Sequence, residues 1–362
     1  MEPLEEEQLF SACEEGNVEE VKQLLNNNSQ KNLQIDSSSL HVACEKGHIE
    51  IVKLLLNNER VEINKANQWN HDTPFYIACE NGHIEIVKLL LNDETFDINK
   101  DYRGITPLWI ACAFGPIEIV NLLLSDERID INKANNYETS PLWIACENRH
   151  IEIVKLLLND ERIDVNKPNK LGWTPLWIAC LRGYIEIVNL LLNSQRVDIN
   201  KADAKGETPF WIACGKGYLE IVKLLLNDKR IDTNNANNSG QTPFYNACKN
   251  EHIEIVKLLL NDERVDINNA NKYESPLFIA YHNEYTEIVE YILANGRDVN
   301  LDRRLKDRIV REREHINQRK LESKEKYRKI VYIVKLLESF ESNPYETRTK
   351  LKIKIGSTGK YL

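Results

Sequence analysis

The chain has 362 residues, of which 42% are hydrophobic and 28% charged, and its formal net charge at pH 7 is −9. This length suits two or three ordinary domains or one elongated array, by the usual prior of roughly 150 residues per domain. No apolar run approaches the roughly 18 residues that cross a bilayer, and the acidic segment Met1–Glu7 lacks the basic and apolar regions of a signal peptide. We therefore expect a protein that is neither secreted nor transmembrane, and that is cytoplasmic or, alternatively, nuclear.

Eight cysteines recur along the chain at nearly constant intervals. Successive cysteines lie 31 to 35 residues apart, and the last four intervals are all 34 residues. Such a period indicates a repeat architecture, whereas a disulfide framework belongs to short secreted chains. Each cysteine follows an alanine, and nine units of about 34 residues fill residues 4–300. The cysteines are Cys13, Cys44, Cys79, Cys112, Cys146, Cys180, Cys214 and Cys248.

Each unit predicts two helices joined by tight turns. In one copy, Thr174 is expected to cap an inner helix, and Pro175 suits the first helical position, where its missing N–H would be unpaired anyway. The short run Leu176–Cys180 then forms the inner helix, which Gly183 ends. A second helix, Ile185–Leu192, has an apolar face wide enough for two neighbouring units. A linker rich in Asp and Asn leads to the next unit through a tight turn.

The Thr-Pro-Leu-x-x-Ala signature and the period resemble those of ankyrin repeats over roughly 80% of the chain. The resemblance implies an all-α fold in which β-turns and pairs of antiparallel helices stack as a curved solenoid with a concave recognition face. End units of such an array act as caps. Two features depart from the family: the linker Asn-Asp-Glu-Arg-Ile-Asp-Ile-Asn is about one residue longer, and the usual histidine after Thr-Pro-Leu survives only as His41.

Beyond residue 300 the repeat becomes irregular. Val331–Leu337 matches the second-helix motif, but it comes about 11 residues too late. We therefore expect residues 301–341 to be a degenerate tenth unit with an insertion, forming a long basic helix that caps the array. Asn343 and Pro344 should stop this helix, and residues 342–362 are expected to be a basic tail, ordered or disordered.

The charge changes sign at the same place. Residues 1–300 carry a net charge of −18 and residues 301–362 a net charge of +9. The plain interpretation is a solvated capping helix that is held partly by attraction to the acidic array. The alternatives are a helix that binds a partner protein, and contact with nucleic acid or an anionic membrane.

No constellation of residues predicts a metal site, a cofactor or catalysis. Cysteines of neighbouring units should lie roughly 8–10 Å apart, beyond the Cα separation of about 7 Å that a disulfide allows. The segment Gly356–Lys360 resembles a phosphate-binding loop in composition, but its residues have the wrong spacing. We therefore predict buried structural thiols, no cofactor, no metal and no enzyme. Four histidines share one turn position and are interpreted as framework residues: His48, His83, His150 and His252.

An aromatic residue replaces the usual histidine in most units. We interpret this aromatic ladder as packing between hairpins and inner helices. The alternative is an apolar stripe beside the recognition groove, because aromatic side chains dominate interface hot spots. The ladder comprises Tyr76, Trp109, Trp143, Trp177, Trp211, Tyr245 and Phe278.

Partner recognition should lie where the units differ from one another. Hairpin tips and inner-helix ends vary most, and large apolar residues gather there in the third to sixth units, as at interaction sites. The alternative is that tip aromatics pack on neighbouring hairpins. The candidate partner-binding residues are Trp69, Tyr102, Arg103, Phe114, Tyr137, Leu171, Trp173, Leu181 and Arg182.

These observations favour a non-enzymatic, monomeric scaffold or adaptor that binds a partner protein through the concave face and the hairpin tips. The competing hypothesis is an adaptor that acts mainly through residues 301–362 on nucleic acid, a membrane surface or an acidic protein. A regulatory subunit of an enzyme is a third hypothesis that the sequence does not separate from the first. The identity of the partner does not follow from the repeats, because a fold does not specify a function.

Overall fold

The computed structural model describes residues 3–27, 35, 37–67, 72–94, 96–101, 104–269, 274–318 and 324–357. Within these ranges the chain forms 21 α-helices and no β-strand. An isolated β-bridge pairs Ile35 with Val61. The all-α prediction is confirmed. None of the described helices combines the length and the apolar character needed to cross a membrane.

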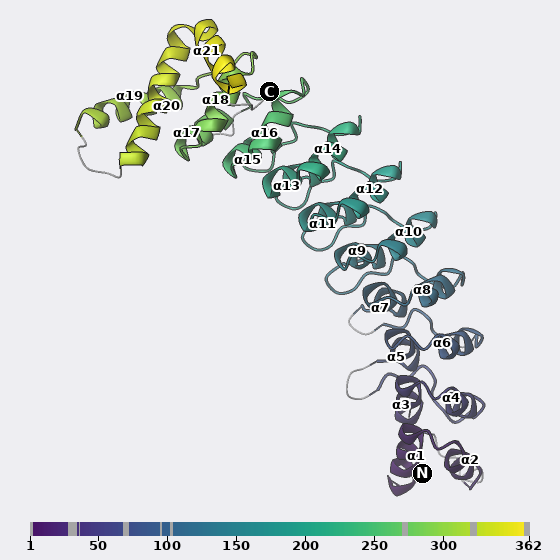
Figure 1. Cartoon of the computed structure of the whole chain (residues 1–362). Helices are drawn as coiled ribbons and strands as arrows, with labels where there is room; N and C mark the ends of the chain where they lie inside the picture. Colours follow the sequence, from purple (N-terminus) through teal and green to yellow (C-terminus); the bar gives the residue numbers. More distant parts are fainter. Residues whose placement is uncertain are drawn as a thin grey trace. The chain divides into compact units, whose positions relative to one another are not determined.

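The chain divides into two compact units, of which unit 1 spans Met1–Pro175. Its helices are α1 (Pro3–Glu15), α2 (Val18–Asn27), α3 (Ser38–Lys46), α4 (Ile49–Leu56), α5 (Pro74–Glu80), α6 (Ile84–Leu91), α7 (Pro107–Phe114), α8 (Ile117–Leu124), α9 (Pro141–Glu147) and α10 (Ile151–Asn159). Odd-numbered helices are the inner helices and each packs against the next inner helix, while the even-numbered outer helices do the same in a second row (Figure 1). Unit 1 is therefore a stack of helix pairs, which is the predicted solenoid architecture.

Unit 2 spans Leu176–Leu362 and continues the same pattern before it changes. Its repeat helices are α11 (Pro175–Arg182), α12 (Ile185–Asn193), α13 (Pro209–Lys216), α14 (Leu219–Asn227), α15 (Pro243–Lys249), α16 (Ile253–Leu260), α17 (Pro276–His282) and α18 (Thr286–Ala294). Inner helices α13, α15 and α17 pack in succession, as do outer helices α12, α14, α16 and α18.

The predicted caps begin the inner helices. At α13, the side chain of Thr208 accepts a hydrogen bond from the backbone N–H of Trp211 at 3.1 Å, and Pro209 takes the first helical position. Gly217 ends the helix with a φ of 80°, a left-handed conformation that side chains resist. Arg149 takes the corresponding place in another repeat with a φ of 62°, so the turn is kept even where the glycine is lost.

The outer helices supply most of the core. In α14, the side chains of Ile221, Val222 and Leu225 are fully buried. Glu220 and Lys223 stay exposed on the opposite face and pair with each other at 2.8 Å. The predicted apolar face is therefore buried between neighbouring pairs, and the charged face is left to solvent.

Residues 301–342 form two helices, where one long helix was expected. They are α19 (Arg303–Gln318) and α20 (Lys324–Ser342), and residues 319–323 lie outside the described part of the chain. Helix α20 carries the second-helix motif and packs against α18, while α19 packs against α20. Both helices bury apolar side chains: Leu305 and Ile309 in α19, and Ile333 and Leu337 in α20. The two helices also contact each other, which two parts of one straight helix could not do.

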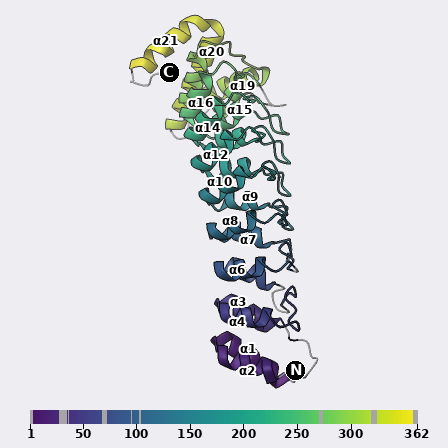
Figure 2. The same ribbon diagram turned by 90° about the vertical axis from the view of Figure 1, so that its right-hand side faces the viewer.

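The basic tail, whose order the sequence left open, forms a helix in its described part, α21 (Pro344–Ser357). Pro344 occupies its first position, and the side-chain oxygen of Asn343 accepts a hydrogen bond from the N–H of Glu346 at 3.2 Å. Helix α21 packs against α18 and α20, and Leu351 and Ile355 are buried. Figure 2 shows α21 beside α20. The Asn-Pro pair was interpreted as a stop signal, but the same pair is also a favourable helix start.

Candidate protein-interaction surface

The aromatic ladder lies between neighbouring helix pairs. The indole N–H of Trp143 donates to the carbonyl oxygen of Trp173 at 3.0 Å, and Trp173 directly precedes Thr174, the residue expected to cap the next inner helix. Each ring thus holds the end of the following hairpin in place. The same bond links Trp109 to Thr139 at 3.0 Å in unit 1, and Trp177 to Glu207 at 2.9 Å and Trp211 to Gln241 at 2.8 Å in unit 2.

The remaining ladder members are also packed. The hydroxyl of Tyr245 donates to the carboxylate of Glu274 at 2.7 Å. Tyr76 is buried, and the ring of Phe278 is half-buried and stacks on the imidazole of His282 with centroids 6.0 Å apart. The tryptophan and Tyr245 bonds therefore connect neighbouring repeats, whereas the stack of Phe278 on His282 lies within α17.

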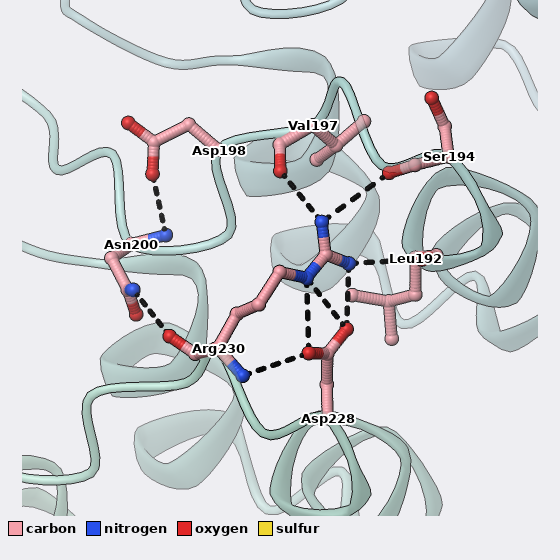
Figure 3. Close-up of polar contacts among 7 residues, drawn as sticks. All are labelled: Leu192, Ser194, Val197, Asp198, Asn200, Asp228 and Arg230. Carbon is pink, nitrogen blue, oxygen red and sulfur yellow. Dashed lines mark hydrogen bonds and ion pairs between the residues drawn. The ribbon is translucent and has the colours of Figure 1, made fainter.

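A second set of contacts, which the sequence analysis did not predict, joins several linkers to the preceding repeat. Figure 3 shows the linker that contains Arg230. The guanidinium of Arg230 pairs with the carboxylate of Asp228 at 2.6 Å. It also donates to the carbonyl oxygens of Leu192 at 3.0 Å, Val197 at 3.2 Å and Ser194 at 3.4 Å. Leu192 lies near the end of α12, so the arginine satisfies a terminal carbonyl of the previous outer helix.

An asparagine completes this join. The side-chain amide of Asn200 donates to the carbonyl of Arg230 at 2.8 Å and its oxygen accepts from the N–H of Asp232 at 2.9 Å. One side chain thereby pairs with the backbone of the next repeat as a strand would. The sequence does contain a signal for these contacts. An Asp-x-Arg triplet and the asparagine that corresponds to Asn200 recur with the repeat period, in the linker that is one residue longer than usual.

Three candidate binding residues of unit 1 are strongly exposed. The exposed fraction is 73% for Tyr137, 65% for Phe114 and 53% for Leu171. A contiguous patch of large exposed apolar residues is typical of an interaction surface, whereas a single exposed apolar residue is common.

Tyr137 and Leu171 occupy neighbouring hairpin tips that are held rigidly. The side-chain oxygen of Asn135 accepts the N–H of Tyr137 at 2.9 Å, and that of Asn169 accepts the N–H of Leu171 at 3.0 Å. The backbone N–H of Lys170 donates to the carbonyl of Tyr137 at 3.0 Å, which fixes one tip against the next. We call Tyr137 and Leu171 the tip patch.

Phe114 lies at the other end of an inner helix. The eight residues of α7 place it about 12 Å from the hairpin end of that helix. The preceding carbonyl, of Ala113, accepts from the amide of Asn148, and Nε2 of His150 also lies 2.9 Å from it. The next repeat therefore covers Ala113 and leaves Phe114 in solvent.

The other candidates have different surroundings. Trp173 is half-buried, with its carbonyl engaged by Trp143. In unit 2, Leu181 is half-buried and Arg182 is exposed at the end of α11. Trp69, Tyr102 and Arg103 lie outside the described residues.

The repeated thiols and imidazoles are structural. All eight cysteines are free and buried, as predicted, and burial raises the pKa of the Cys13 thiol to about 12. Nε2 of His83 lies 2.9 Å from the carbonyl oxygen of Glu45 in the preceding repeat, and His252 makes the same contact with Gly215 at 2.9 Å. Within the described ranges, no group of three or more His, Cys, Asp or Glu could hold a metal ion.

Comparison with protein families gives one match that spans the repeats. A family model described as ankyrin repeats (three copies) matches overlapping segments of the chain. Its matches cover residues 4–67, 40–135, 93–169, 127–203, 195–271 and 231–303. A comparison with curated proteins found no match.

Proposed function

Because the chain belongs to the ankyrin-repeat family, whose members are generally protein-interaction modules and typically not enzymes, we propose that it is a non-enzymatic scaffold for a partner protein. The proposed binding surface in unit 1 is the tip patch of Tyr137 and Leu171 together with Phe114. The single observation that carries it is the exposure of these three large apolar side chains on a rigid framework.

The energetics support this use of the surface. Full burial of a side chain of this size by a partner contributes about 1.5–3 kcal/mol. The tips are already ordered by their Asn135 and Asn169 side chains, so ordering them costs a partner little. Aromatic anchors on a preorganised surface are typical of interface hot spots.

The negative charge of the repeat array favours a partner protein with a basic surface. Residues 1–300 carry a net charge of −18, which attracts basic surfaces and accelerates their approach. We therefore propose a partner with an apolar centre and a basic rim. Removing the apolar side chains should shorten the bound lifetime and leave the association rate unchanged, whereas added salt should slow association.

The experiment compares the full chain with the triple variant Phe114→Ala, Tyr137→Ala, Leu171→Ala in proximity labelling followed by quantitative mass spectrometry. We expect the partner to be lost from the triple variant, with a fall in affinity of at least about a hundredfold if each side chain contributes roughly 1–2 kcal/mol. All three side chains are exposed, so circular dichroism should show unchanged helical content.

The matched control is Ile185→Ala, which removes an apolar side chain that is 48% exposed on α12. This variant should keep the partner. An identical set of labelled proteins from the triple variant and the unaltered chain would show that the three residues do not form the binding surface.

A further inference from the structure

Helix α21 has apolar residues on two faces, only one of which is used by the fold. Leu351 and Ile355 are buried against the rest of unit 2. Tyr345 and Ile353 point the other way, with exposed fractions of 81% and 67%. These two residues are eight positions apart, a little over two turns, and therefore share one side of the helix with the exposed Thr349 between them.

The inner face of α21 is fastened by charged contacts. The ammonium of Lys354 donates to the carboxylate of Glu290 at 2.5 Å, and the hydroxyl of Tyr332 donates to the same oxygen at 2.7 Å. The guanidinium of Arg348 donates to the carbonyl of Arg297 at 2.6 Å. The orientation of the helix is thereby set, and Tyr345 and Ile353 are held outwards.

Lysines flank the exposed apolar stripe on both sides. By helical position, Lys352 lies on one side of the stripe and Lys350 on the other, and both are exposed. Glu346 is the acidic group of this face; it pairs with Lys350 at 2.6 Å. The surrounding segment, residues 301–362, has a net charge of +9, so the face belongs to a strongly basic part of the chain.

We propose that this outer face of α21, formed by Tyr345, Thr349, Ile353, Lys350 and Lys352, binds an anionic lipid surface. Because the inner face of α21 is buried by the fold, only its outer face meets solvent, and there an apolar stripe bordered by lysines can lie in a membrane interface. Lysine side chains can extend along the helix to lipid phosphates while the stripe inserts between headgroups. Charge complementarity therefore selects the anionic leaflet.

A single helix face suits a flat lipid surface better than a protein partner. A stable protein interface buries about 800 Å² on each side and has a well-packed centre, whereas this stripe offers two apolar side chains.

The test is co-sedimentation of the full chain with vesicles of phosphatidylcholine alone or of phosphatidylcholine mixed with phosphatidylserine. We expect binding to the mixed vesicles, none to phosphatidylcholine alone, and a loss of binding as salt rises. Lys350→Gln combined with Lys352→Gln should weaken partitioning roughly 25-fold, from about fivefold for each lysine. Tyr345→Ser combined with Ile353→Ser should weaken it by at least about tenfold.

Ile185→Ser is the matched control, because it removes an exposed isoleucine from a helix outside this segment and should leave partitioning unchanged. Thermal melts identify any variant that has lost its fold, and Ile353→Leu should then restore what Ile353→Ser removes. Equal binding of all variants, or equal binding to neutral vesicles, overturns the proposal. A self-association that weakens with salt and is abolished by the lysine substitutions also overturns the proposal. Analytical ultracentrifugation would detect it, and the partner of this helix face would then be the acidic array of a second copy.

Discussion

Arg230 joins two neighbouring repeats through hydrogen bonds and an ion pair. Its guanidinium reaches carbonyl oxygens around the end of α12, and its pairing with Asp228 holds it in that position. A charged donor that satisfies terminal helix carbonyls contributes more than an exposed ion pair, because those carbonyls have no partner within the helix. Equivalent arginines act in both units: Arg128 and Arg162 in unit 1 and Arg264 in unit 2 donate to Leu91, Leu124 and Leu226.

Arg230→Met should lower the free energy of unfolding by about 1–2 kcal/mol, because it removes these donors and leaves the carboxylate of Asp228 with the backbone N–H of residue 230 as its remaining partner among the contacts described. Urea denaturation followed by circular dichroism measures the change. The control Lys223→Gln breaks an exposed pair on α14 and should change stability by no more than about 0.5 kcal/mol.

The same variant should alter the dependence of stability on pH. The hydrogen bond from Arg230 lowers the pKa of Asp228 below its ordinary value. A depressed pKa in the folded state adds stability above the unfolded pKa of about 4, and that stability is lost as the pH falls through the folded pKa. The difference between Arg230→Met and the unaltered chain should therefore shrink below about pH 4; a constant difference would mean that the pair contributes nothing to the effect.

Individual helices differ in how much of their structure the sequence determines. The inner and outer helices were predictable because each carries its own cap, apolar face and stop, repeated with one period. Helix α21 was not predictable in this way, since Asn343 and Pro344 fit both the end of one helix and the start of another, and only packing against α18 and α20 decides between them.

The tip residues Tyr137 and Leu171 were identifiable because hairpin tips vary between repeats, but their exposure depends on turns held by Asn135 and Asn169. The arginine contacts could not be predicted from the sequence, because they connect residues that lie about one repeat period apart.

Lys354 is the residue whose loss should loosen α21. Glu290 is only 8% exposed, so Lys354→Met leaves a nearly buried carboxylate with the hydroxyl of Tyr332 as its remaining partner among the contacts described. We expect a loss of about 1–2 kcal/mol, less than for a fully buried pair because the Lys354 side chain is 51% exposed.

A double-mutant cycle with Glu290→Gln separates the pair from other effects. The cost of Lys354→Met should largely disappear when Glu290 is already neutral, and urea denaturation of the four proteins measures the coupling. Lys350→Met serves as the matched control, since its pair with Glu346 is exposed. Strictly additive losses would show that Lys354 and Glu290 do not act together.

The whole molecule combines local packing with a separation of charge. Helix contacts run from each pair to the next within both units, so stability is built from repeats and from the interfaces between adjacent repeats. The net charge of −9 is the sum of an array at −18 and a C-terminal segment at +9. On our two proposals, one chain presents apolar tips on an acidic array to a protein and the outer face of a basic helix to a lipid surface.

Local packing predicts that a cavity in one helix pair weakens its neighbours first. Leu225 of α14 is fully buried, and Leu225→Ala should cost about 2–5 kcal/mol. Hydrogen exchange measured by mass spectrometry should then accelerate in α12, α14 and α16, because α14 packs against α12 and α16, and change less in α20 and α21. The exposed Lys223 of the same helix, changed to alanine, should leave exchange unaltered throughout. A uniform acceleration across unit 2 would mean that the unit opens as a single cooperative block, and stability would then have to be assigned to the unit and not to its repeats.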